Sequence, residues 1–220
     1  MNNLVDRLES LKNKGYYPDT ILDIGACWGG WTRSVIKIYN DSNYFLFEAI
    51  DYPDLKMMQC RNIQSFNVLL NDKIEEVDWY EMKNTGDSMY KERTHHFTNC
   101  EPIKRESIDL NTFIERNNIL KDSKNILIKI DCQGAEIPIL KGASAIIART
   151  DFIILELPFF GNYNTGVPTF IEHIKYMDSI GFVPYDIIES HYMNDFYMQI
   201  DMIFINKNHK FTNTVNELLL

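Results

Sequence analysis

The chain has 220 residues, of which 45% are hydrophobic and 13% aromatic, enough to form a core and to exclude global disorder. Asp and Glu outnumber Lys and Arg by 31 to 22, and the formal charge of -9 disfavours nucleic acid as the main substrate. No apolar run approaches the roughly 20 residues of a membrane span, and the charged N-terminal segment does not resemble a signal peptide. We therefore expect a soluble, cytoplasmic protein whose membrane contacts, if any, are peripheral.

Strand-like and helix-like segments alternate along the chain. Compact apolar runs predict strands over residues 20–24, 44–47, 65–70, 125–130, 151–155, 182–188 and 200–205. Helical spacing predicts helices over residues 2–14, 31–39, 53–61, 107–117, 135–148, 168–180 and 211–220. Ser107 is the expected cap of the fourth of these helices. Turn residues between 75 and 105 indicate a hairpin-like insertion.

The alternation predicts one α/β domain over residues 1–220, with a helix in the N-terminal segment 1–18. The central sheet should be Rossmann-like and mostly parallel, and the last strand is the candidate for an antiparallel edge. The four cysteines lack metal-ligand spacing and are expected to be reduced thiols.

A turn of small residues follows the first predicted strand. Asp23, Gly25, Ala26 and Gly29 precede a helix that carries Thr32. Glycines let a ligand approach the backbone closely, and N–H groups at a helix N-terminus favour anionic ligand groups. In open α/β sheets such turns lie where ligands bind, at the carboxyl ends of the strands. The G-x-x-x-G spacing argues against NAD, whose folds use G-x-G-x-x-G, although a purely structural turn would have the same residues.

Polar residues end the next two predicted strands. Glu48 ends the second strand, and a carboxylate at this position can accept hydrogen bonds from both hydroxyls of a ribose. The alternative is a surface glutamate. Asn71 and Asp72 end the third strand and are candidates for contacts with an adenine amino group, although the same pair is common in turns.

The segment from Lys129 to Ala143 carries the pattern Lys-Ile-Asp-x-x-Gly-Ala-Glu-x-x-x-Leu-Lys-Gly-Ala. This pattern resembles the signature of the FkbM family of methyltransferases. The similarity covers residues 20–206 and includes Asp23–Gly29, Phe47-Glu48, Ser107–Asp109, Leu155-Glu156, Gly181-Phe182, Tyr185–Ile187 and Gln199–Phe204. The chain departs from the family at Ala49, where a proline often follows the glutamate, and at Gln133, where an acidic residue is usual.

The resemblance implies a class I methyltransferase fold with S-adenosyl-L-methionine as the methyl donor, and an oxygen atom as the usual acceptor, often on a sugar or natural product. In such a site the residues from Asp23 to Gly29, together with Glu48, would bind this cofactor. Thr32 would contact its carboxylate, and Ser88 its methionine part if the insertion folds over the site. Asp131 would lie beside its sulfonium.

Three residues are candidates for catalysis. Asp131 ends the fourth strand, where it could orient the acceptor or remove its proton, and capping of the next helix is an equal alternative. Glu156 ends the fifth strand and faces the same rim. His191 follows the sixth strand, in a loop that could close over an acceptor. Carboxylates could also bind a divalent cation, but no spacing demands one, and we predict no metal site.

We therefore predict an S-adenosylmethionine-dependent O-methyltransferase that acts on a hydroxyl, with a sugar or a glycan or glycolipid precursor as the leading acceptor. One alternative is an N-methyltransferase acting on a small amine or a protein side chain. Another is a catalytically inactive protein of the same fold that serves as a partner in a complex. The binding partner of the enzyme would be a small molecule or glycan, and a homo-oligomer is possible.

Overall fold

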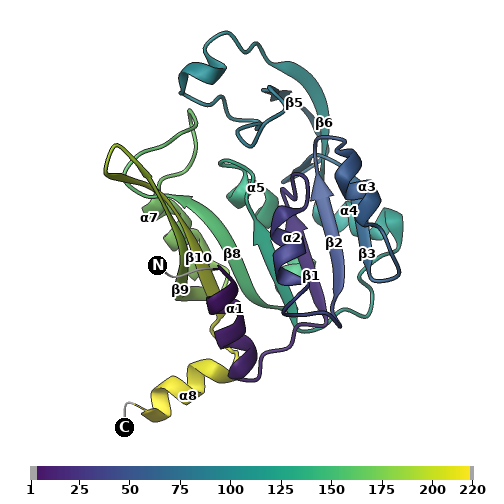
Figure 1. Cartoon of the computed structure of the whole chain (residues 1–220), viewed down its shortest axis with the longest axis vertical. Coiled ribbons are helices and arrows are strands. Elements are labelled where there is room, and N and C mark those ends of the chain that lie inside the picture. Colours follow the sequence, from purple (N-terminus) through teal and green to yellow (C-terminus); the bar gives the residue numbers. More distant parts are fainter. Residues whose placement is uncertain (1–3, 219–220) are drawn as a thin grey trace.

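A computed structural model describes residues 4–218, and a seven-stranded sheet forms its centre (Figure 1). Its strands, in spatial order, are β3 (Ile63–Asn67), β2 (Asn43–Glu48), β1 (Thr20–Ile24), β7 (Ile126–Ile130), β8 (Thr150–Pro158), β10 (Phe196–Asn206) and β9 (Phe182–Met193). The first five strands run parallel, whereas β10 is antiparallel to both of its neighbours. The predicted α/β fold, with a mostly parallel sheet and an antiparallel edge strand, is confirmed.

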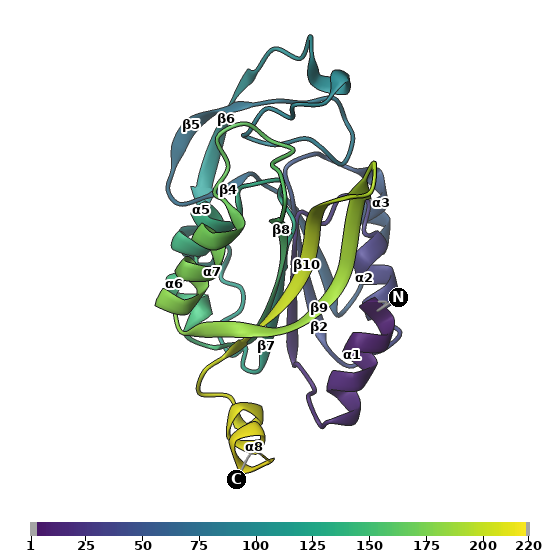
Figure 2. The ribbon, with the colours of Figure 1, turned by 90° about the vertical axis from the view of Figure 1, so that its left-hand side faces the viewer.

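Helices cover both faces of this sheet (Figure 2). On one face lie α1 (Leu4–Asn13), α2 (Gly30–Val35) and α3 (Pro53–Met58), which bury Leu8, Val35 and Leu55 in one core cluster. On the other face lie α4 (Leu110–Asn117), α5 (Glu136–Lys141), α6 (Ser144–Ile147) and α7 (Phe170–Ser179), with a second core cluster beneath them. Because β1 and β7 are covered on both faces, every one of their residues is buried, which explains their continuous apolar sequences.

A three-stranded sheet lies beyond the carboxyl ends of the parallel strands. Its strands, in spatial order, are β4 (Leu70–Asn71), β6 (Ile103–Asp109) and β5 (Glu75–Trp79). β5 and β6 pair antiparallel, and the segment between them, which includes the 3-10 helix η1 (His95–Phe97), extends over the end of the main sheet (Figure 1). The predicted hairpin-like insertion therefore lies above the edge at which parallel strands end.

The helix cap predicted at Ser107 is wrong. Ser107 lies in β6, and its hydroxyl donates to the backbone oxygens of Lys73 and Glu75, both at 3.1 Å. Asp109 caps α4 instead, because its carboxylate accepts a hydrogen bond from Thr112 N at 2.8 Å.

Two predicted elements are divided. The helix expected over residues 135–148 is interrupted at Gly142, where a Cβ atom would lie 2.4 Å from Asn71 O, and α5 and α6 result. The strand expected over residues 65–70 also forms two elements. β3 ends at Asn67, and the chain then enters the smaller sheet as β4. Both divisions occur where the smaller sheet packs against the main one.

The last two strands form a hairpin longer than the segments predicted over 182–188 and 200–205. Asn194 and Asp195 join them with φ angles of 47° and 66°, and two positive φ angles are what a type I′ turn requires. The antiparallel edge is therefore β9, and the last strand, β10, lies inside it. As a consequence, His191 belongs to a strand and not to a loop.

The remaining helices have shorter bounds than predicted. The segments expected over 2–14, 31–39, 53–61 and 211–220 correspond to α1, α2, α3 and α8 (Lys210–Leu218). Residues 1–3 and 219–220 of these predictions lie outside the described residues. None of the helices within residues 4–218 combines the length and the apolar composition that crossing a membrane requires.

Candidate active site

A cavity of about 460 Å³ lies at the carboxyl ends of the parallel strands. Its wall includes residues at the ends of four neighbouring strands, Ile24, Glu48, Asp131 and Glu156, and residues 84–87 of the insertion. The chain places β2 and then β3 on one side of β1, and β7 and then β8 on its other side. The strand order therefore reverses at β1. The cavity therefore occupies the switch point at which open α/β sheets bind ligands.

The turn after β1 requires glycine at two positions. Gly25 has a φ angle of 75°, and a Cβ atom there would lie 1.9 Å from Asp131 O. Gly29 has a φ angle of 80°, and a Cβ atom there would lie 2.4 Å from Met58 Sδ. Gly25 is part of the cavity wall, whereas Ala26 is buried beneath it. The absence of a Cβ atom at Gly25 thus lets the backbone of Asp131 approach the start of the turn closely.

Two of the N–H groups on this turn are already hydrogen bonded. Gly25 N and Ala26 N donate to Phe47 O, at 2.9 and 3.2 Å, and so join the turn to β2. These two groups do not have the role in anion binding that the sequence suggested.

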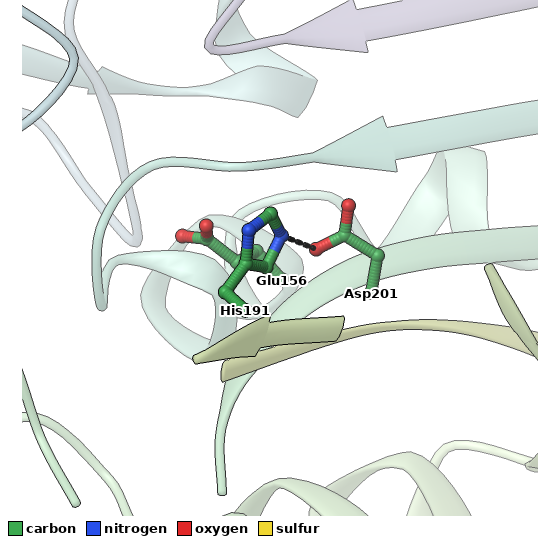
Figure 3. Close-up of side chains that lie close together, drawn as sticks. All are labelled: Glu156, His191 and Asp201. Carbon is green, nitrogen blue, oxygen red and sulfur yellow. Dashed lines mark ion pairs between the residues drawn. The ribbon is translucent and has the colours of Figure 1, made fainter. Parts of the chain in front are cut away.

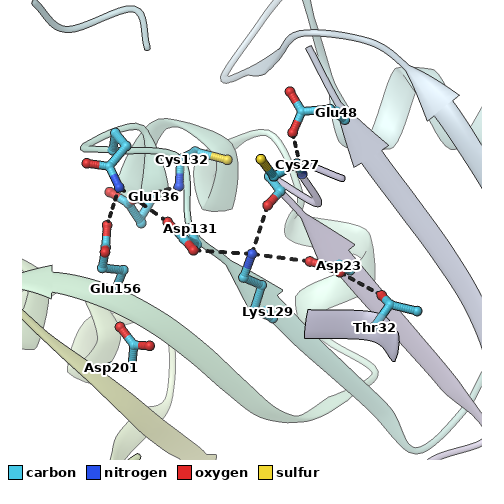
Figure 4. A network of polar contacts seen from close by, with 12 residues as sticks. Asp23, Cys27, Thr32, Glu48, Lys129, Asp131, Cys132, Glu136, Glu156 and Asp201 are labelled. Atoms are coloured by element: carbon cyan, nitrogen blue, oxygen red, sulfur yellow. Dashed lines mark hydrogen bonds and ion pairs between the residues drawn. The ribbon is translucent and has the colours of Figure 1, made fainter. Parts of the chain in front are cut away.

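Glu48 is held by the same turn. Its Oε2 accepts a hydrogen bond from Cys27 N at 2.7 Å (Figure 4), and its Oε1 accepts one from Ile50 N at 2.8 Å. Each carboxylate oxygen can accept a further hydrogen bond, and Glu48 lines the cavity. Burial raises the pKa of Glu48, while the two N–H donors and the ammonium of Lys129 oppose this rise. The result is a carboxylate fixed in orientation, with both oxygens able to bind a diol.

Asp23 and Thr32 lie beneath the cavity and not in its wall. The Thr32 hydroxyl donates to Asp23 Oδ2 at 2.6 Å, and Asp23 Oδ1 lies 3.2 Å from Lys129 Nζ (Figure 4). All three side chains are buried. The Thr32 hydroxyl is fully buried and donates to Asp23, so the geometry does not support the contact predicted between Thr32 and a ligand carboxylate. Asp23 and Thr32 support the turn from below.

The polar pair after the third predicted strand is also displaced from the cavity. Asn71 is buried in β4, where its amide donates to Glu75 Oε1 at 3.1 Å and to Ser107 Oγ at 3.4 Å. Asp72 is exposed beyond it. Neither residue lines the cavity, so the adenine contacts predicted for them lack geometric support. The segment after β3 that does line it is apolar and consists of Val68, Leu69 and Leu70.

Ser88 joins the insertion to the loop after β7. Its hydroxyl is buried and lies 3.0 Å from Gln133 O and 3.3 Å from Cys132 O, to which it can donate. The neighbouring residues 84–87 and Met89 face the cavity, whereas Ser88 does not. Its predicted contact with the ligand is thus replaced by a role in holding the insertion over the site.

Asp131 directly follows β7, Glu156 lies near the end of the adjacent strand β8, and both residues line the cavity wall. The Gln133 amide donates to Glu156 Oε2 at 2.7 Å and lies 3.5 Å from Asp131 Oδ1, so it bridges the two carboxylates. Asp131 Oδ2 also lies 3.4 Å from Lys129 Nζ, and its side chain is 40% exposed. Burial and the nearby carboxylates of Asp131 and Asp201 raise the pKa of Glu156 well above its usual value.

Glu136 orders the loop that carries Asp131. Its Oε1 accepts hydrogen bonds from Cys132 N at 2.9 Å and from Gly134 N at 3.3 Å. Its Oε2 lies 3.8 Å from His173 Nε2 on α7, and both side chains are buried. Glu136 therefore has a structural place behind the site.

His191 reaches the cavity wall from β9. Its Nε2 lies 3.7 Å from Oδ1 of Asp201 on β10, and the Asp201 carboxylate raises the pKa of His191 (Figure 3). Asp201 is in turn directly opposite Glu156 on β8. The three catalytic candidates from the sequence, Asp131, Glu156 and His191, therefore lie in one wall of one cavity.

The sequence from the glycine turn to β9 matches a known family. Residues 23–184 match the family model described as the methyltransferase FkbM domain. The chain belongs to the FkbM methyltransferase family. The match spans the turn at Gly25, Glu48, the loop at Asp131 and Glu156, which are the residues that the fold brings to the cavity. No curated protein sequence matches the chain.

Solved structures show the same fold at low sequence identity. The FkbM methyltransferase of Methylobacillus flagellatus KT aligns with 84% of this chain, at 14% identity and a TM-score of 0.52. This FkbM chain spans 43% of that protein, which is less than half of its length. Magnesium protoporphyrin IX methyltransferase from Synechocystis PCC 6803, solved with bound SAM, aligns over 92% of this chain and 77% of its own, at 6% identity and a TM-score of 0.50. An uncharacterized protein from Listeria monocytogenes serotype 4b aligns over 95% and 69%, at 10% identity and a TM-score of 0.51.

Several residues in or behind the wall of the FkbM cavity were not predicted as site residues from the sequence. Lys129 had a local signal, because it is a cation within a buried apolar strand and needs an anionic partner. Asp201, Gln199 and Tyr163 had no such signal, since their approach to the site depends on how β10 pairs with β8 and β9 and on the course of the loop after β8.

Proposed function

We propose that this FkbM-family protein is an S-adenosylmethionine-dependent O-methyltransferase. The observation that carries the proposal is the fixed Glu48 carboxylate beside the glycine turn, in the wall of a cavity large enough for a nucleoside. Family membership supports the reaction class. The bound SAM in the Synechocystis enzyme supports the choice of cofactor.

The residues of the cavity fit this cofactor. The two oxygens of Glu48 can accept hydrogen bonds from the two ribose hydroxyls. Apolar side chains of Phe47, Val68 and Leu69 provide a surface on which a flat adenine ring can pack. Gly25 and Asp131 both line the cavity, and the methionine part would lie along this section of the wall. When bound, the cofactor supplies an electrophilic methyl group on a sulfonium.

The acceptor end of the cavity contains the groups that the transfer needs. Asp131 is accessible, and its carboxylate can orient an acceptor hydroxyl and accept its proton. A bound cofactor would supply the methyl group to this oxygen, with S-adenosylhomocysteine as the leaving group. Glu156 and His191 complete the polar wall around the acceptor. Positioning of the acceptor oxygen in line with the breaking bond is the main contribution of the protein.

The acceptor that we propose is a hydroxyl of a sugar or of a glycan or glycolipid precursor. The wall beyond Asp131 combines carboxylates with the amides of Gln133 and Gln199 and the ring of Tyr163. Such a set can donate and accept many hydrogen bonds, which suits a ligand with several hydroxyls. We further propose that the chain forms one methyltransferase domain, with the insertion as part of its cavity wall.

Calorimetric titration with S-adenosylhomocysteine tests the cofactor site. We expect saturable binding to the wild-type protein. Loss of a charged hydrogen-bond acceptor typically costs about 1–3 kcal/mol, so Glu48→Ala should bind about 5- to 150-fold more weakly. Glu76→Ala, which changes an exposed glutamate on β5, is the matched control and should bind as the wild type does.

Thermal unfolding of both variants shows whether they remain folded, since Glu48 also holds the turn. Folded wild-type protein that does not bind S-adenosylhomocysteine would overturn the proposal. Incubation with methyl-labelled cofactor and a panel of sugar nucleotides and glycolipid precursors then tests the acceptor. Transfer of the label to an amine and not to a hydroxyl would contradict O-methylation.

A further inference from the structure

Three polar side chains on three adjacent strands converge at the acceptor end of the cavity (Figure 3). Glu156 on β8 is directly opposite Asp201 on β10. His191 on β9 is opposite Gln199, which is two residues before Asp201 and so lies on the same face of β10. The register of the sheet therefore brings one imidazole and two carboxylates together from positions far apart in the sequence.

The spacing of these groups suits a metal ion. One ligand atom from each of Glu156, His191 and Asp201 lies within 4.8 Å of the other two. Ligands that are each 2.0–2.6 Å from a common ion lie up to about 5 Å apart, so the three atoms can share one ion with small side-chain movements. Imidazole with carboxylate ligands suits Mn²⁺ and similar divalent ions.

Two of the three groups lack a hydrogen-bond partner. His191 Nε2 and Asp201 Oδ1 are both inaccessible to solvent, and neither has a hydrogen bond with the residues that the structure describes. They face each other at 3.7 Å, which is beyond hydrogen-bond distance. Glu156 uses Oε2 to accept from Gln133, and its Oε1 is not engaged by that bond. Buried polar atoms without partners are costly, and a shared cation would satisfy them.

The charge around these groups points the same way. Three carboxylates lie together here, because Asp201 is directly opposite Glu156 and the Gln133 amide bridges Glu156 and Asp131. The ammonium in this region, that of Lys129, lies between Asp23 and Asp131 and donates to Gly25 O. Negative charge at the acceptor end thus exceeds the positive charge that the neighbouring side chains supply, and a divalent cation would offset it.

We propose that Glu156, His191 and Asp201 bind a divalent metal ion at the acceptor end of the cavity. Glu156 and His191 line the cavity, so coordination positions not used by the protein would face the acceptor. A hydroxyl bound to the ion loses its proton more readily, and nearby Asp131 can accept this proton. This catalytic role rests on the proposed methyltransferase function, whereas binding of the ion does not.

Electron paramagnetic resonance with Mn²⁺ tests the site without any assay of activity. Chelator-treated full-length protein is titrated with MnCl₂, and loss of the signal of free Mn²⁺ measures binding. We expect one ion per chain for the wild type. Asp201→Asn and His191→Gln each remove one ligand with little change of volume, and each should weaken binding at least tenfold. His96→Gln, on the exposed 3-10 helix of the insertion, is the control and should bind as the wild type does.

The same samples are titrated with S-adenosylhomocysteine, which separates the two proposals and shows that each variant is folded. If Asp201→Asn and His191→Gln bind Mn²⁺ as tightly as the wild type does, the proposed metal site is wrong. The two residues would then form only an ion pair with each other. The absence of Mn²⁺ binding in wild-type protein that binds S-adenosylhomocysteine would also overturn it. Mn²⁺ binding that depends on His191 and Asp201, without binding of S-adenosylhomocysteine, would support the metal site and contradict the cofactor.

Discussion

Asp23 on β1 and Lys129 on β7 are directly paired across two parallel strands, and their buried side chains form an ion pair of 3.2 Å. Lys129 Nζ also donates to Gly25 O at 2.8 Å and lies 3.4 Å from Asp131 Oδ2. Burial lowers the pKa of Lys129, but the Asp23 and Asp131 carboxylates outweigh it and raise the pKa above its usual value. One ammonium therefore joins the glycine turn to the strand end that carries Asp131.

Removal of this ammonium should destabilise the fold. Lys129→Met leaves the Asp23 carboxylate buried without a cation, and breaking a buried pair in this way costs about 3–5 kcal/mol. We expect a decrease of that size in the free energy of unfolding, measured by urea denaturation. The double variant Asp23→Asn/Lys129→Met removes both charges and should recover part of the loss.

Lys104→Met is the matched control, because Lys104 forms an ion pair of 2.8 Å with Asp78 on the surface, where its side chain is 60% exposed. This variant should unfold as the wild type does. Equal stability of Lys129→Met and Lys104→Met would show that the buried pair does not support the fold.

Substitution of two glycines would separate the energetic cost of backbone strain from that of close packing. Gly25 and Gly15 both have positive φ angles, 75° and 89°, but only at Gly25 would a Cβ atom meet another atom within 4 Å. Gly15→Ala should therefore cost about 1–2 kcal/mol from the left-handed conformation. Gly25→Ala should cost about 1–3 kcal/mol more, because Asp131 O must move. Thermal unfolding measures both. Similar losses in the two variants would mean that the turn tolerates the movement.

Gln133 offers a test of the bridge between two carboxylates. Gln133→Ala removes the hydrogen bond to Glu156 at 2.7 Å and should lower kcat about tenfold or more, since hydrogen bonds to charged groups contribute about 1.5–3 kcal/mol. The affinity for S-adenosylhomocysteine should change little, because Glu48 is unaffected. Gln64→Ala, which alters an exposed residue of β3, is the control for both measurements. A loss of cofactor affinity without a loss of kcat would place Gln133 in the cofactor site instead.

The cofactor side of the cavity could be predicted from the sequence because its parts are local. Gly25 directly follows β1 and Glu48 is the last residue of β2, and both strands have strong apolar patterns. Parallel strands bring their carboxyl ends to one edge of the sheet. The role of Thr32 could not be predicted, because its hydroxyl donates to Asp23 through the packing of α2 against β1. The prediction that Asn71 contacts a ligand failed for a similar reason. Its strand, β4, belongs to the smaller sheet, and its amide donates a hydrogen bond to Glu75.

The acceptor side depends on long-range pairing and was only partly predicted. Asp131 and Glu156 were identified because each follows an apolar strand pattern, although Glu156 lies within β8, which extends to Pro158. His191 was identified as a residue but assigned to a loop. Asp201 was not among the predicted site residues, and its partnership with His191 was not recognised. The pairing of β9 with β10 contains three register irregularities, and a shift of one residue reverses which face a side chain occupies. No local pattern specifies such shifts.

Asp151, on β8 at the opposite end of the strand from Glu156, predicts a dependence of stability on pH. Burial and the Asp19 carboxylate raise the pKa of Asp151 to about 6, and Lys210 opposes this only in part. Because the unfolded chain releases this proton at lower pH than the folded one does, ionisation of Asp151 destabilises the fold progressively from about pH 4 to 6. Asp151→Asn should thus be more stable than the wild type at pH 8 and nearly equal to it at pH 4. The expected difference in the free energy of unfolding at pH 8 is about 1 kcal/mol, because solvent screens the charge at this half-buried position. Urea denaturation at both pH values measures this difference, and the exposed control Asp41→Asn should show none. A gain for Asp151→Asn that is equal at pH 4 and pH 8 would instead reflect packing or hydrogen bonding.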